Sequence, residues 1–143
     1  MSLIVKAVTR VTIGIIFLFG GYIVAHGHLT PGGGFAGGVI IALCYILYVL
    51  AYGKVEAEEL ANKKEAEVVE SLGALMFLTL ALLGFAAGFF FANFLPKGSP
   101  GSIFSAGIIP LCNIAIMFKV GAGLFAAFIV LVVFRVRARK EEE

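Results

Sequence analysis

The sequence predicts an all-α integral membrane protein with four transmembrane helices and with both termini in the cytoplasm. The 143 residues are 61% hydrophobic, and the mean hydropathy of +1.06 exceeds that of a soluble domain of this size. Four long apolar runs alternate with segments rich in glycine, proline or charge. Because a span takes roughly 20 residues, the chain has room for one membrane domain, 1–143, of about four spans.

The first two spans are predicted at about 3–25 and 35–52. Lys6 and Arg10 lie four residues apart near the start of the first span, so both can extend to one membrane interface. This run has the length of a span and no cleavage-site pattern, so it is interpreted as a retained helix rather than a signal peptide. The second span ends at Gly53, after tyrosines whose amphipathic rings suit the headgroup level.

The other two spans are predicted at about 71–95 and 103–134. The connector 53–70 that precedes them carries most of the glutamates and is interpreted as a solvated, helical segment. The third span is rich in phenylalanine and apolar on all sides, as expected for contact with lipid or with neighbouring helices. Pro110 lies inside the fourth span, where it predicts a kink.

Basic residues lie almost entirely on one side of this predicted topology. With the N-terminus inside, the inner side holds all lysines and arginines except Lys97, in the loop before the fourth span, and Lys119, within that span. Short loops rich in lysine and arginine stay in the cytoplasm. We therefore expect a multi-pass protein of the cell membrane, with both termini and the connector in the cytoplasm.

The segment that joins the first two spans has the most distinctive composition. It reads His26-Gly27-His28-Leu29-Thr30-Pro31-Gly32-Gly33-Gly34-Phe35-Ala36-Gly37-Gly38. Thr30-Pro31-Gly32 predicts a tight turn, Phe35 is expected to anchor the next helix, and the glycines that follow Gly32 permit close backbone approach. Histidine exchanges protons near neutral pH, so His26 and His28 serve ion passage at the outer mouth or are simply solvated. No further metal ligand lies nearby, so no metal site is expected.

Lys119 lies near the centre of the fourth span. An ionisable group at that depth costs about 3 kcal/mol or more and indicates a functional site. No acidic residue is predicted at the same depth, so Lys119 is neutral, is solvated in a cavity, or pairs with a carboxylate of another subunit. It serves an ion pathway or locks subunits together. Asn113, after Pro110, is a further pathway candidate or a helix–helix hydrogen bond.

Several other functions are excluded or unsupported. Gly32, Gly34 and Gly37 match a dinucleotide-binding pattern, but a membrane span precedes them where that motif requires a strand. No basic surface interleaved with aromatics indicates nucleic-acid binding, and Cys44 and Cys112 are interpreted as packed thiols. No nucleophile accompanied by a base is evident. We therefore expect no catalysis and no cofactor in this chain.

The hairpin motif resembles the signature of the MnhB/MrpB family, small membrane subunits of multisubunit Na+/H+ antiporters. The resemblance continues in four later segments, Gly98-Ser99-Pro100-Gly101, Phe104-Ser105-Ala106-Gly107, Ile109-Pro110-Leu111-Cys112-Asn113 and Lys119-Val120-Gly121-Ala122-Gly123. It implies a module that exchanges Na+ for H+ beside larger antiporter-like subunits in the lipid bilayer. It also implies that such a module can belong to archaeal membrane-bound hydrogenases and related complexes.

Two roles follow from this resemblance together with Lys119. The first is a subunit that contributes to ion translocation at a subunit interface, where a neighbouring subunit supplies an acidic partner for Lys119. The second is a purely structural subunit that seals the interface between antiporter-like chains. A free-standing transporter is disfavoured because four helices with one unpaired charge do not make a self-contained site.

Overall fold

The computed structural model describes residues 2–53, 63–103 and 105–141 and is all-helical in this part of the chain. Its elements are α1 (Leu3–Ala25), α2 (Gly34–Tyr52), α4 (Lys63–Leu83), the short 3-10 helix η1 (Gly84–Ala87) and α5 (Ile109–Glu141). Four of the helical segments are long and apolar enough to cross a membrane. The predicted all-helical fold with four candidate spans is confirmed.

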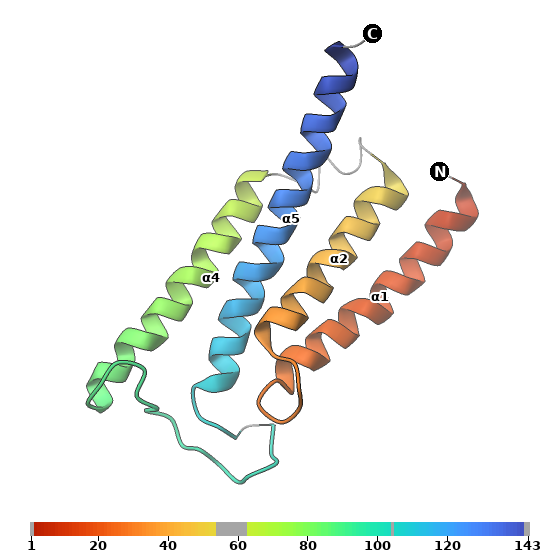
Figure 1. Ribbon diagram of the computed structural model, residues 1–143. Helices are drawn as coiled ribbons and strands as arrows, with labels where there is room; N and C mark the ends of the chain where they lie inside the picture. Colours follow the sequence, from red (N-terminus) through yellow and green to blue (C-terminus); the bar gives the residue numbers. More distant parts are fainter. Residues whose placement is uncertain (1, 54–62, 104, 142–143) are drawn as a thin grey trace.

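The four long helices lie in a single row in the order α4, α5, α2, α1 (Figure 1). The central helix is α5, which packs against α4 on one side and α2 on the other, and α1 packs mainly against α2 and also touches α5. No contact between α1 and α4 closes this row into a ring among the residues described. The row therefore ends at α4 on one side and at α1 on the other.

The row has two distinct ends (Figure 1). The start of α1, the end of α2, the start of α4 and the end of α5 lie together at what we call the connector end. The hairpin, 26–33, and the return loop, 88–103 with 105–108, lie at the opposite, hairpin end. Both chain ends therefore lie at the same end of the row as the connector, as the predicted topology requires. The charge distribution is the basis for assigning this end to the cytoplasm.

Small residues at the helix contacts let the backbones approach closely. Alanine is the commonest residue at the buried hydrophobic positions, for example Ala42, Ala81 and Ala115. A Cβ at Gly38 would lie 3.0 Å from the Met117 carbonyl oxygen, so α2 and α5 touch almost backbone to backbone. Helix association in membranes depends on such packing because lipid removes most of the hydrophobic drive between helices.

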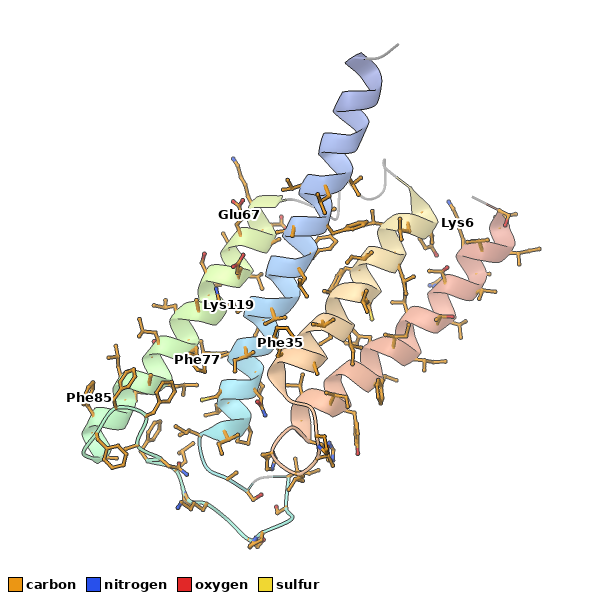
Figure 2. All side chains as sticks on the ribbon, in the orientation of Figure 1. Lys6, Phe35, Glu67, Phe77, Phe85 and Lys119 are labelled. Atoms are coloured by element: carbon orange, nitrogen blue, oxygen red, sulfur yellow. The ribbon has the colours of Figure 1, made fainter. Side chains whose placement is uncertain are left out.

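The predicted boundaries of the first two spans, 3–25 and 35–52, are confirmed within a residue, whereas that of the third, 71–95, is wrong. This helix already begins at Lys63 and gives way to η1 after Leu83. The chain then folds back onto Gly84. The contact is so close that a Cβ on Gly84 would lie 2.6 Å from the Ala92 nitrogen. Phe89, Phe90, Phe91 and Phe94 therefore lie in the return loop, and Phe85 lies in η1 at the hairpin end (Figure 2). Connector residues 54–62 are outside the described residues.

The fourth span also starts later than predicted, at Ile109 rather than at 103. Ala106 and Gly107 have φ values of 70° and 63°, which a helix excludes. Pro110 is consequently the second residue of α5, and the predicted kink is wrong. Proline is tolerated in the first turn of a helix because the backbone N–H that it lacks has no intrahelical partner there.

Asn93 stabilises the return loop and the start of α5. Its Oδ1 accepts hydrogen bonds from the backbone N–H of Leu95 and of Ile108, each at 3.2 Å. Asn93→Ala removes this acceptor and both of its hydrogen bonds, at a cost of about 1–3 kcal/mol. We expect limited proteolysis of the return loop in the purified complex to accelerate accordingly. Asn93→Asp keeps an acceptor oxygen and should resist cleavage like the wild type, and equal cleavage of Asn93→Ala would contradict this assignment.

Candidate functional site

Lys119 of α5 forms an ion pair with Glu70 of α4. The Lys119 Nζ and Glu70 Oε1 atoms are 3.4 Å apart, and the side chains are 52% and 38% exposed, respectively. Both residues lie inside the candidate membrane spans, Lys64–Ala87 and Ile109–Val132. Figure 2 shows Lys119 between α4 and α5, and it shows Glu67 closer to the connector end. The pair is thus open to one broad face of the row at membrane depth.

The prediction that no acidic residue lies at the depth of Lys119 is wrong. It followed from placing the third span at 71–95, which left Glu70 in the connector. Because α4 begins at Lys63, Glu70 is about two turns into the helix. The carboxylate that Lys119 was expected to obtain from another subunit is therefore present in the same chain.

Two glycines make room for this ion pair. A Cβ on Gly73 would lie 2.7 Å from the Lys119 nitrogen and 2.9 Å from the Ala115 carbonyl oxygen, so α4 and α5 are in backbone contact beside Lys119. A Cβ on Gly123 would lie 3.3 Å from the Glu70 carboxyl carbon. The contact of Gly73 with α5 was not predicted, because one sequence does not show which faces of two helices meet.

Asn113 of α5 connects this helix to the start of α2. Its Oδ1 accepts a hydrogen bond from the Gly34 N–H at 3.3 Å. The first amides of a helix have no intrahelical acceptor, and the N-cap residue Gly33 has no side chain to supply one. Asn113 provides that acceptor across the helix contact, so the structure shows the helix–helix hydrogen bond that the sequence left as one alternative. Its Nδ2 is buried and has no hydrogen-bond partner among the described residues.

The two histidines make separate contacts. The His26 ring stacks on Tyr22 with centroids 4.1 Å apart, and its Nδ1 lies 3.1 Å from the Tyr22 carbonyl oxygen. The His28 Nε2 lies 3.2 Å from the Ser102 carbonyl oxygen and so links the hairpin to the return loop. The Ser105 hydroxyl donates to that same oxygen at 2.6 Å. Both histidines are partly buried within this chain.

The hairpin glycines lie where the helices touch, as predicted, and the flanking residues do not. Gly33, Gly34, Gly37 and Gly38 are buried, whereas Pro31 is exposed. Phe35 is 66% exposed, so it does not anchor α2 within this chain. The hydrogen-bonded turn lies earlier than Thr30-Pro31-Gly32, because the N–H groups of Leu29 and Thr30 donate to the His26 carbonyl oxygen.

Lys119 and Asn113 lie at separate positions along α5. Lys119 lies at membrane depth, and Asn113 lies about 9 Å closer to the hairpin end, given the rise of an α-helix. Four helices that are long and apolar enough to cross a membrane define an all-helical, multi-pass membrane protein. Residues 4–126 match the family described as a domain related to the MnhB subunit of a Na+/H+ antiporter. The chain belongs to this MnhB family, and the resemblance inferred from the hairpin is confirmed.

Similar proteins have been described in archaea and bacteria. The chain is 41% identical over 132 residues to the uncharacterized protein MJ1307 of Methanocaldococcus jannaschii, covering 87% of this chain and 48% of that one. It is 42% identical over 51 residues to the putative antiporter subunit mnhB2 of Staphylococcus epidermidis, which is 36% of each chain. The chain therefore spans half or less of the length of these relatives.

A solved structure has the same arrangement of helices. It is the membrane-bound sulfane sulfur reductase, an archaeal respiratory membrane complex, one chain of which is 35% identical with a TM-score of 0.76. The match covers 87% of the present chain and 55% of the chain in that complex. The present fold thus occurs within a larger chain of a membrane complex.

Proposed function

We propose that this chain is a small membrane subunit of a multisubunit Na+/H+ antiporter module and contributes to ion translocation at a subunit interface. Membership of the MnhB family supports the antiporter module. The likeness to a chain of an archaeal respiratory membrane complex supports an assembly with other membrane subunits, driven by redox chemistry elsewhere. The chain itself carries out no catalysis and holds no cofactor in this proposal, and its termini lie in the cytoplasm.

The exposed Glu70–Lys119 pair is the observation that carries the proposal. An ion pair facing lipid would pay a desolvation cost of several kcal/mol. A neighbouring subunit or a water-lined cavity must therefore cover this face of α4 and α5. Because the helices form a single row, they enclose no passage of their own among the described residues. An ion path beside Glu70 and Lys119 accordingly runs between this chain and a neighbour.

A purely structural role is the second candidate. It is favoured by α1, in which only Gly20 and Val24 are buried and which exposes large apolar side chains on its other sides. Such a helix can pack against the transmembrane helices of other subunits. In this role the Glu70–Lys119 pair would fix the position of the subunit and would take no part in transport.

Lys119→Ala distinguishes the two roles. The variant complex is purified, its subunit composition is determined, and Na+-dependent proton movement is measured in vesicles. The proposed role predicts a normal set of subunits with exchange reduced by about tenfold or more. Loss of this chain from the complex would instead identify the pair as a structural lock, and normal exchange would refute the pathway role.

A further inference from the structure

The geometry around Glu70 leaves its carboxylate accessible to a cation. The Nζ–Oε1 distance of 3.4 Å exceeds the roughly 2.7–2.9 Å of a tight charge-assisted hydrogen bond. One side of the carboxyl group packs against the α5 backbone at Gly123, and the Glu70 side chain is 38% exposed. Carboxylate oxygens are the ligands that hard cations prefer. Because the Glu70 side chain is partly exposed, its carboxylate oxygens can be reached by a cation.

Charge balance at membrane depth links a bound cation to the Lys119 proton. The carboxylate with a protonated amine is neutral overall, and so is the carboxylate with bound Na+ and a neutral amine. Holding Na+ and the protonated amine together would leave a net positive charge within the span, which is strongly disfavoured. Occupation by one cation is thus coupled to the loss of one proton.

Few other ionisable groups lie near the pair. On α4, Lys64, Glu65 and Glu67 are all closer to the connector end. On α2, which packs on the other side of α5, the titratable groups are Cys44 and three tyrosines, and no residue from Gly34 to Tyr52 is formally charged. Within Ile109–Val132 of α5, Lys119 is the sole charged residue. The charge at this place is therefore set by Glu70 and Lys119.

We propose that Glu70 and Lys119 form a one-for-one exchange site, in which Na+ on the Glu70 carboxylate and a proton on the Lys119 amine exclude each other. In the exchange, Na+ binds Oε1 or Oε2 of Glu70, one N–H bond of Lys119 breaks, and the proton leaves to water at the subunit interface. The reverse step restores the ion pair. This inference rests on the proposed role in Na+/H+ exchange and assigns the site where the two ions compete.

Lys119→Arg tests the inference because arginine retains the positive charge and the pairing but does not release its proton. The purified complex, in weakly buffered detergent solution with a pH indicator dye, receives NaCl or, as the matched control, choline chloride. We expect wild-type complex to release one more proton per complex on Na+ addition than the Lys119→Arg or Glu70→Gln complex. In vesicles, exchange by Lys119→Arg should fall by about tenfold or more.

Equal proton release and exchange by wild-type and Lys119→Arg complexes would overturn the exchange site. If Lys119→Arg does not assemble, the near-isosteric Glu70→Gln variant decides, since unchanged proton release without the carboxylate overturns the inference as well. Failure of the exchange site and failure of the proposed role in Na+/H+ exchange give different results. An active Lys119→Arg complex beside an inactive Lys119→Ala complex refutes the exchange site alone, whereas normal exchange by Lys119→Ala refutes the pathway role and the site together.

Discussion

Gly34→Ala is expected to remove this chain from its complex. A Cβ at Gly34 would collide with the carbonyl oxygen of Asn113 and would lie 2.8 Å from the Cβ of Ile116. These atoms belong to or adjoin the α5 backbone, so only separation of α2 from α5 relieves the clash. Overpacking of this kind costs about 1–3 kcal/mol or more, and separation also stretches the hydrogen bond from Gly34 to Asn113. The measurement is the amount of this chain in the purified complex.

Gly21→Ala is the matched control. Gly21 lies in α1, and a Cβ there would meet nothing within 4 Å. Alanine is favoured over glycine inside a helix by about 1 kcal/mol, so Gly21→Ala should assemble as well as wild type or better. A Gly34→Ala complex with the normal amount of this chain would show that the contact between α2 and α5 is looser than described.

Glu70→Lys is expected to have an equally large effect. It places two ammonium groups within the span and leaves neither with a carboxylate, where one unpaired charge already costs about 3 kcal/mol. We expect the chain to be lost from the membrane complex, together with its exchange activity. Adding Lys119→Glu reverses the pair and should return most of the chain to the complex, because the two side chains can again neutralise each other.

Recovery in the double variant is the decisive comparison for the Glu70–Lys119 contact. Glu67→Lys makes the same change of charge about one turn closer to the connector end, where a long side chain extends to the interface, and should retain assembly. If Glu70→Lys with Lys119→Glu is lost as completely as Glu70→Lys alone, the two residues do not pair within the folded chain. Subunit composition measured by mass spectrometry reports all three variants in one assay.

The sequence was sufficient for the first half of the fold and misleading in the second. The ends of α1 and α2 are marked by sharp changes of composition at the hairpin and at Gly53. The segment after Leu83 is as apolar as a span, but Gly84 lets the chain fold back and Gly88, with φ of 119°, ends η1. Hydrophobicity does not distinguish a phenylalanine-rich loop from a helix, and Asn93 stabilises this loop through tertiary hydrogen bonds.

Only one of the two residues of the candidate ion pair was predicted from the sequence. Lys119 was evident because a charge far from the ends of an apolar run is conspicuous. Glu70 was missed because the charged residues before it placed it in a solvated connector, although a helix was expected there, rather than in the span itself. Its helical spacing from Gly73 could have indicated a shared face, but the partner face on α5 depends on how two helices pack, which a single sequence does not reveal.

The most direct test of an ion path beside Glu70 and Lys119 is the exchange rate of a complex that lacks both charges. In Glu70→Gln with Lys119→Met no charge is left unpaired, and replacing such a pair with neutral groups is often harmless to stability. Na+-driven proton movement is then measured in vesicles that contain the fully assembled complex. The proposed function predicts exchange lower by about tenfold or more. Exchange at the wild-type rate in that assembled complex would contradict it and would leave this chain a structural subunit.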